Sequence, residues 1–338
     1  MQNFLDPAIL FFVAGVIAGV LRSDLEIPQP IAKFLSLYLL MALGLKGGFA
    51  LSSSGVDLTV ALSLAAAMAM AFIVPALGYG FLRHHVSRFD AAAVAASYGS
   101  VSAVTFVTAM QYLESAGMHA GGHMAVAMVL MESPAVIVAV TLANMVRHSQ
   151  ATVGVNVGGG VMVLGQGGNA ASDSSSGIGK ILYESLTNGV HLLLMASLLI
   201  GYVSGDAGKA MMHPFSFDLF KGMLAFFLLD MGLMVAKNLP SVRDKSPVLI
   251  AYAALGPLVH AFIALLIAVA LGLPAADGAL LMVLSASASY IVVPAVLRYA
   301  IPEANPSLYL GLALGVTFPL NILLGIPLYS VVARNLLG

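Results

Sequence analysis

Long runs of apolar residues with almost no charge occupy most of this chain. Each run holds about 20 residues or more, the length that an α-helix needs to cross a bilayer. Only 9% of the 338 residues are charged, whereas a soluble domain carries about 25% charged residues. Such a chain cannot cover a water-facing surface, so the sequence predicts an all-α polytopic membrane protein. An outer-membrane barrel is disfavoured because the apolar residues form continuous runs rather than alternating.

The runs predict ten transmembrane spans, five on each side of a polar segment. The predicted spans are 5–22, 31–53, 56–81, 89–113, 121–146, 182–204, 216–237, 247–272, 277–299 and 307–332. The polar segment, 148–180, is rich in Gly, Ser and Asn, which is typical of a flexible hydrophilic linker. We therefore expect a first five-helix repeat (1–147), a linker (148–180) and a second five-helix repeat (181–338).

Weak internal similarity supports the division into two halves. Residues of the first half recur in the second at a nearly constant offset: Leu43-Gly44-Leu45 with Met231-Gly232-Leu233, Asp90 with Asp277, and Pro134 with Pro319. Because each half has an odd number of spans, the second half must enter the membrane upside down. The sequence thus predicts a 5+5 inverted repeat, a common transporter architecture.

The distribution of Lys and Arg predicts the orientation. Ten of the 14 basic residues fall in or near the loops that follow odd-numbered spans. The positive-inside rule places these loops, and with them the linker, in the cytoplasm. We expect a multi-pass protein of a bacterial-type inner membrane with both termini outside.

Two predicted spans, the fourth and the ninth, are interrupted by small hydroxyl residues. The interruptions lie at 97–105 and 285–290. A helix that begins inside the membrane exposes unpaired N–H groups that attract anions. If the two breaks meet near the midplane, they form a site for a small anion with room for a monovalent cation; the alternative is that these small residues only pack helices together. The predicted substrate-binding residues are Gly99, Ser100, Val101, Ser102, Thr105, Ser285, Ser287 and Ser289.

Ionisable residues inside the predicted spans are candidates for cation coupling, since a charge in the membrane is costly and usually functional. Glu132 lies next to Pro134, which frees a backbone carbonyl one turn back. Asp230 lies in the middle of the seventh span. Lys46 could pair with Glu132 or Asp230, face an anion, stand in for a metal cation, or extend its ammonium to the membrane interface. The candidate Na⁺ ligands are Ser100, Ser102, Glu132 and Ser289.

Several function classes find no support in the sequence. It contains no zinc-protease, phosphate-loop or nucleophile-elbow motif, so we expect no enzyme and no cofactor beyond sodium as a coupling ion. The net charge of −1 argues against nucleic acid as a partner. The absence of cysteine excludes disulfides and thiolate metal sites.

At the two breaks and their flanks the sequence resembles the sodium-dependent bicarbonate transporter family of the SbtA type. The resemblance implies a ten-span 5+5 inverted repeat whose members carry bicarbonate inward with sodium, the anion held where the broken helices cross. It also implies a homotrimer in membrane lipid and, for some members, inhibition by a cytoplasmic PII-like protein. The matching segments are 44–48, 99–105, 131–135, 285–289, 294–298 and 301–307.

The chain departs from this family at two positions. Tyr290 stands where well-known members carry an acidic residue after the serine string, and Lys46 stands where they carry a threonine. We therefore add Tyr290 to the cation-coupling candidates Glu132, Asp230 and Lys46. Our hypothesis is that the Lys46 ammonium replaces a bound sodium or that the anion differs. Alternatives are a sodium- or proton-coupled carrier of a small organic anion, an anion channel, and a transporter-like sensor or scaffold.

Overall fold

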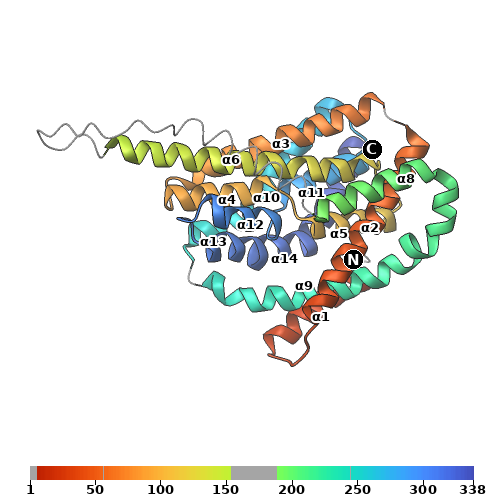
Figure 1. Ribbon diagram of the computed structural model, residues 1–338, viewed down its shortest axis with the longest axis horizontal. Coiled ribbons are helices and arrows are strands. Elements are labelled where there is room, and N and C mark those ends of the chain that lie inside the picture. The colour runs from red at the N-terminus through yellow and green to blue at the C-terminus, as the bar shows by residue number, and fades with distance from the viewer. Residues whose placement is uncertain (1–5, 56, 154–188, 244) are drawn as a thin grey trace, which may run out of the picture.

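The computed structural model describes residues 6–55, 57–153, 189–243 and 245–338, and all of its regular structure there is helical (Figure 1). The first half contains α1 (Pro7–Val20), α2 (Gln29–Ser54), α3 (Leu58–Leu82), α4 (Arg88–Gly99), α5 (Ala103–Ser115) and α6 (His123–Val153). The second half contains α8 (Gly189–His213), η2 (Pro214–Asp218), α9 (Leu219–Arg243), α10 (Pro247–Leu271), α11 (Ala275–Ala286) and α12 (Val292–Ala300). A last run consists of α13 (Pro306–Leu312), η3 (Ala313–Thr317), α14 (Phe318–Leu320), η4 (Asn321–Gly325) and α15 (Ile326–Leu337). The prediction of an all-α protein is confirmed for the described residues.

Six helical stretches of the described chain are long and apolar enough to cross a membrane. They are Gln29–Ser53, Leu58–Leu82, Arg88–Ser115, Leu192–Val242, Pro247–Leu271 and Pro306–Leu337. Leu192–Val242 is 51 residues long and combines α8 with α9, while a single crossing needs only about 20 residues. Shorter apolar helices add Pro7–Val20, His123–Glu132 and Ala275–Ala286. The chain is therefore a multi-pass membrane protein.

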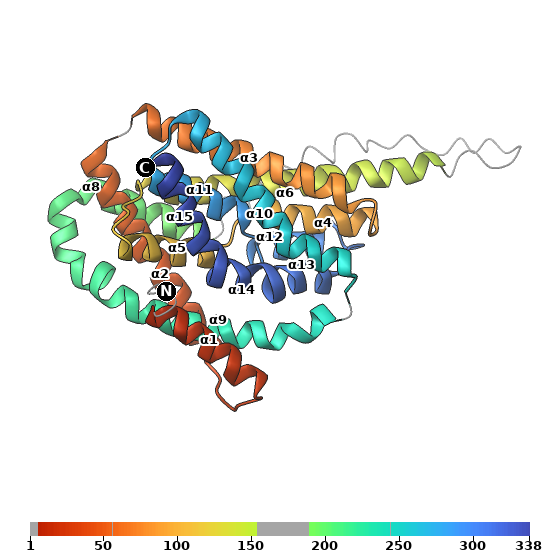
Figure 2. The same ribbon diagram turned by 180° about the vertical axis from the view of Figure 1, so that it is seen from behind.

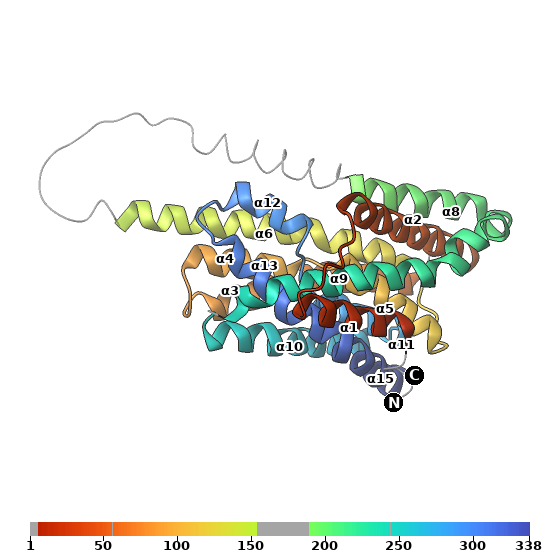
Figure 3. The same ribbon diagram turned by 90° about the horizontal axis from the view of Figure 1, so that it is seen from below.

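Helix α6 is longer than the predicted fifth span. It continues to Val153, beyond the boundary expected after Arg147, and runs to the end of the molecule opposite the C-terminus (Figures 1 and 3). The first residues assigned to the predicted linker are thus helical. Residues 154–180, the rest of that linker, lie outside the described residues.

Helices α1, α2, α8 and α9 form one group, in which α2 packs along α8 and α1 along α9 (Figure 3). Glycine permits the close approach: a Cβ on Gly48 would lie 2.2 Å from the Leu198 carbonyl oxygen, and one on Gly232 would lie 2.2 Å from that of Phe12. Small residues at such crossings are how membrane helices bring their backbones together. The α8–α9 run bends at Gly205, whose φ of +52° favours glycine, and curves around one side of the molecule (Figure 2).

The remaining helices form a second group that encloses the two breaks. Helix α3 packs against α4 and α6, and α11 packs against α10 and α15. The breaks lie inside this group: every residue from Ala91 to Val101 and from Ala276 to Tyr290 is buried. The interrupted segments are therefore the interior of the protein and not connecting loops on its surface.

Two aspartates link each half of the chain to a loop of the other. Asp90, near the start of α4, accepts a hydrogen bond from the backbone N–H of Asn305 at 2.8 Å. Asp277, in the first turn of α11, accepts one from the backbone N–H of Gly121 at 2.7 Å. These two residues are the pair that matched between the halves, and they make corresponding contacts.

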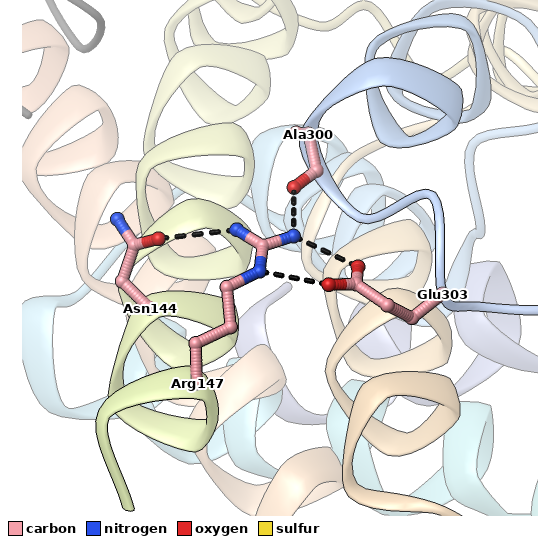
Figure 4. Close-up of polar contacts among 4 residues, drawn as sticks. All are labelled: Asn144, Arg147, Ala300 and Glu303. Carbon is pink, nitrogen blue, oxygen red and sulfur yellow. Dashed lines mark hydrogen bonds and ion pairs between the residues drawn. The ribbon is translucent and has the colours of Figure 1, made fainter. Parts of the chain in front are cut away.

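Arg147, in the C-terminal part of α6, binds the loop that follows α12 (Figure 4). Its guanidinium makes two 2.8 Å contacts with the Glu303 carboxylate. It also donates to the carbonyl oxygen of Ala300 at 3.0 Å and to the side-chain oxygen of Asn144 at 3.2 Å. These contacts lie in the part of the chain that carries the family-like segment 301–307, and they give that segment a structural role.

The Glu303→Gln variant is expected to melt about 1–3 °C lower in detergent at pH 7, because an exposed ion pair contributes about 0–1 kcal/mol. The Arg147 hydrogen bonds lower the pKa of Glu303. A carboxyl with a depressed pKa stabilises the fold above its unfolded pKa of about 4.3 and loses this contribution as the pH falls through its folded pKa. The difference between wild type and variant should therefore shrink below about pH 4. An equal shift from Asp24→Asn, at an exposed carboxyl, would contradict a specific role.

Candidate substrate and ion site

The first break separates α4 from α5. Helix α4 ends at Gly99, Ser100 is extended (φ −94°, ψ 175°), and Ser102 is extended again (φ −100°, ψ 111°) before α5 begins. Ser102 caps α5 by accepting a hydrogen bond from the backbone N–H of Thr105 at 3.2 Å, the usual role of serine at a helix start. Gly99 is needed because a Cβ there would lie 2.7 Å from the ring of Pro75 in α3.

The second break separates α11 from α12 in a similar way. Helix α11 ends at Ala286, and Ser287 is extended (φ −88°, ψ 167°). Ser289 Oγ accepts from the backbone N–H of Val293 at 3.4 Å, in the first turn of α12. Both breaks therefore consist of an extended segment with a serine that supports the start of the following helix.

The two breaks contact each other through hydrogen bonds. The backbone N–H of Ser102 donates to Ser287 Oγ at 3.0 Å, and Ser287 Oγ donates to the carbonyl oxygen of Leu284 at 2.8 Å. In the other direction, the backbone N–H of Ser289 donates to the carbonyl oxygen of Ser97 at 2.7 Å. Serines far apart in sequence thus share one buried crossing.

Several buried hydroxyl oxygens around the crossing have no hydrogen-bond partner among the described residues. They belong to Ser97, Ser100, Thr105 and Ser285. Buried polar groups in folded proteins are almost always paired, and in a membrane no bulk water is nearby to satisfy them. These hydroxyls therefore mark the crossing as a place where a bound ion or a small polar substrate would complete the hydrogen bonding.

A cavity of about 80 Å³ adjoins the crossing. A cavity needs about 10–15 Å³ of such volume to hold one water molecule, so this one has room for several waters or a small ion, whereas pockets for drug-sized ligands measure about 300 Å³ or more. It lies between the two helix groups, since α2 and α8 contribute to one wall. The lining residues are Ser36, Leu40, Val101, Ser102, Ala103, Val104, Met128, Glu132, Leu194, Ser289, Tyr290 and Ile291.

Glu132 and Tyr290 both lie at this cavity, one on α6 and one in the second break. Glu132 is only 6% exposed and lines the same cavity as the hydroxyl-bearing Ser102 and Ser289. Oxygen ligands of this kind suit sodium. The Tyr290 ring packs edge-on against Phe318, with ring centroids 5.6 Å apart. An aromatic side chain therefore lines the cavity at this point of the second break.

Lys46 lies elsewhere. Its ammonium contacts Glu114 Oε2 at 2.9 Å and sits over the rings of Phe217 and Phe220, 4.7 and 4.2 Å from their centroids. It borders a separate cavity of about 170 Å³ and does not line the one at the crossing.

Of the alternatives that the sequence left open for Lys46, the pairing with Glu132 or Asp230 is wrong, because its partner is Glu114. Glu114 lies just beyond the predicted fourth span, where nothing in the sequence ties it to the second span. Asp230 is half-buried on α9 and also does not line the cavity at the crossing. A fixed ammonium in place of a bound sodium at the crossing does not fit this geometry.

The predicted substrate residues divide into two sets. Val101, Ser102 and Ser289 line the cavity. The others are buried in or beside the breaks without lining it, and they are Gly99, Ser100, Thr105, Ser285 and Ser287.

The sequence did not indicate the opposite wall of the cavity. Ser36 and Leu40 come from α2, Met128 from α6 and Leu194 from α8. These residues stand in ordinary apolar runs with no motif to mark them. The carbonyl of Ser97, which receives a hydrogen bond from the second break, was likewise missed because every residue has such a carbonyl.

A helical membrane protein with two interrupted helices that meet beside a small cavity, lined by a few polar side chains among apolar ones, has the architecture of membrane transporters. The comparison with known families agrees: the model of the Na⁺-dependent bicarbonate transporter superfamily matches residues 7–334, nearly the whole chain. The chain belongs to this superfamily, so the resemblance noted from the sequence is confirmed. None of the curated proteins compared with the chain matches it.

Proposed function

We propose that this protein is a secondary transporter that imports bicarbonate with sodium, by alternating access at the crossing of the two breaks. The observation that carries the proposal is the hydrogen-bonded contact of the breaks beside a small cavity with one carboxylate. Membership of the superfamily supports sodium-dependent bicarbonate transport in general. We infer the site residues, the order of the helices in the membrane and the alternating access from the geometry.

We infer ten crossings arranged as two inverted five-helix repeats. The helix contacts support this arrangement. In such a repeat α1 corresponds to α8 and α2 to α9, so the contact of α2 with α8 corresponds to the contact of α9 with α1. The hydrogen bonds of Asp90 and Asp277 to loops of the opposite half form a second such pair. Inverted repeats place a transporter's substrate site at the repeat interface, which is where the breaks meet.

The substrate is an anion of the size of bicarbonate. Helices α5 and α12 begin at the breaks, and helix N-termini stabilise negative charge. The unpaired hydroxyls of Ser100, Thr105 and Ser285 provide neutral hydrogen bonds close by. The small volume of the cavity favours an inorganic anion over a larger organic carboxylate.

Sodium binds between the Glu132 carboxylate and the hydroxyls of Ser102 and Ser289, with Ser100 adjacent. A sodium ion next to Glu132 adds a positive charge to the cavity, and this charge attracts the substrate anion. Binding of the anion and binding of sodium thus favour each other. The position of the cavity between the two helix groups supports alternating access, since a relative movement of the groups would change the side of the membrane to which the cavity opens.

We place the protein in a bacterial-type inner membrane with both termini outside, as the distribution of basic residues predicts. The proposed partners are membrane lipid and two further copies of the chain in a homotrimer. A cytoplasmic PII-like regulator remains a hypothesis from the family resemblance.

Uptake of radiolabelled bicarbonate into vesicles, with the sodium gradient switched on and off, tests the proposal. We expect uptake that saturates with bicarbonate and falls when the sodium gradient is removed. Uptake driven by protons, or of acetate in preference to bicarbonate, would favour a carrier of organic anions. Flux that does not saturate would favour an anion channel, and binding without flux would favour a sensor or scaffold.

Glu132→Gln and Lys46→Thr are expected to affect sodium differently. Loss of a charged ligand costs about 1.5–3 kcal/mol, so Glu132→Gln should raise the sodium concentration for half-maximal uptake at least about tenfold. Lys46→Thr should leave that concentration within about twofold of wild type, because Lys46 pairs with Glu114 away from the cavity. A clear change of sodium dependence in Lys46→Thr would restore the hypothesis that its ammonium replaces sodium.

A further inference from the structure

The last helical run of the chain is irregular where it passes the two breaks. It contains two π-helical turns, η3 (Ala313–Thr317) and η4 (Asn321–Gly325), on either side of a short segment that holds Pro319. π-Helical turns are rare and occur frequently at functional sites. Here they carry two buried polar side chains, Thr317 and Asn321.

Thr317 holds the end of α4. Its hydroxyl donates to the carbonyl oxygen of Ala253 at 2.7 Å. A threonine hydroxyl has one proton, so it accepts the 2.6 Å hydrogen bond from the Tyr98 hydroxyl. Tyr98 is the penultimate residue of α4, directly before the first break.

Asn321 holds the end of α11. Its Nδ2 donates to the carbonyl oxygen of Ala286 at 2.7 Å, and its Oδ1 accepts from the Tyr329 hydroxyl at 3.3 Å. Ala286 is the last residue of α11, and carbonyl groups at a helix end lack a partner within the helix. A side chain of the last run therefore satisfies the backbone directly before the second break.

We propose that Thr317 and Asn321 are positioning residues that set the relative placement of the two breaks. Neither lines the cavity at the crossing, so they act through Tyr98 and Ala286. This inference rests on the proposed transport of bicarbonate at the crossing. A site built from two helix ends is as precise as the groups that hold those ends, and displacements well below 1 Å matter for binding geometry.

The test compares bicarbonate uptake by full-length variants at saturating sodium. We expect Thr317→Val, Tyr98→Phe and Asn321→Leu each to raise the KM for bicarbonate about tenfold, with smaller changes in maximal rate and in melting temperature. Thr317→Ser, which keeps the hydroxyl, should behave like wild type. The double variant of Tyr98→Phe and Thr317→Val should be no worse than Thr317→Val alone, because Thr317→Val already removes the bond that Tyr98→Phe removes.

An unchanged KM in all three variants, with only a lower melting temperature, would mean that these residues only stabilise the fold. This result would overturn the inference. If Thr317→Val does not fold, Tyr98→Phe tests the same bond from its other side. A wild type without bicarbonate uptake would refute the proposed function instead. The inference then rests on a second readout, which uses the absence of cysteine from the chain.

A single cysteine introduced by Val101→Cys reports the shape of the cavity, which Val101 lines. Its rate of modification by a small thiol reagent should change several-fold when Thr317→Val or Asn321→Leu is added. Thr317→Ser should leave the rate unchanged. Identical rates in all backgrounds would show that the last run does not position the first break.

Discussion

Gly99→Val is expected to lower bicarbonate uptake about 100-fold while the protein still reaches the membrane. A Cβ at this position would lie 2.7 Å from two ring atoms of Pro75. The proline ring cannot rotate away as a flexible side chain could, so the end of α4 must move. Because the first break follows at the next residue, the movement displaces Ser100 and Ser102, and a displacement of about 1 Å at a binding site can cost about 100-fold in rate.

Uptake in vesicles, normalised to the amount of transporter, measures this effect. Gly80→Val is the matched control, since Gly80 is exposed on α3 and a Cβ there meets no atom within 4 Å. It should transport like wild type. Normal uptake by Gly99→Val would mean that the end of α4 can move without affecting transport. This result would contradict the assignment of the substrate site to the crossing.

Ser287→Leu is expected to have an effect of similar size. Ser287 is 1% exposed and accepts the backbone N–H of Ser102, so leucine both fills the crossing and removes this acceptor. Ser287→Ala removes the hydroxyl without filling the crossing, and an unpaired buried N–H costs about 1–3 kcal/mol. We therefore expect about a 100-fold loss of uptake for leucine and about a tenfold loss for alanine.

Ser204→Leu serves as the control for this pair. Ser204 is exposed on α8, and its hydroxyl donates to the carbonyl oxygen of Ile200 within the same helix. Both leucine variants add the same volume, but only one adds it at the crossing. Equal uptake by Ser287→Leu and Ser204→Leu would contradict the assignment of the site.

The two serine strings could be identified from the sequence because they break a strong pattern. Small hydroxyl residues are conspicuous inside apolar runs, and their recurrence at a constant offset pointed to one shared site. The structure brings Ser102 and Ser287 into direct contact. Glu132 could also be identified, since a carboxylate in an apolar run is costly, and it lies at the cavity.

Lys46 shows where such reasoning fails. A buried lysine needs a partner, but its partner is set by which helices pack together and at what height. Glu114 is separated from Lys46 by 68 residues, at the end of another helix, and the sequence indicated only Glu132 and Asp230 as partners. The contact depends on the packing of α2 against α5, which no local pattern encodes.

The sequence by itself determined the helical membrane class, the superfamily and the two interrupted segments. These properties follow from composition and from patterns along the chain, because a bilayer leaves few ways to satisfy a backbone. Only the tertiary structure decided which serines meet, that Tyr98 and Ala286 are held from the last helical run, and that Lys46 stands apart from the cavity. Those contacts join residues that are remote in sequence, so they depend on the packing of whole helices and become visible only once that packing is known.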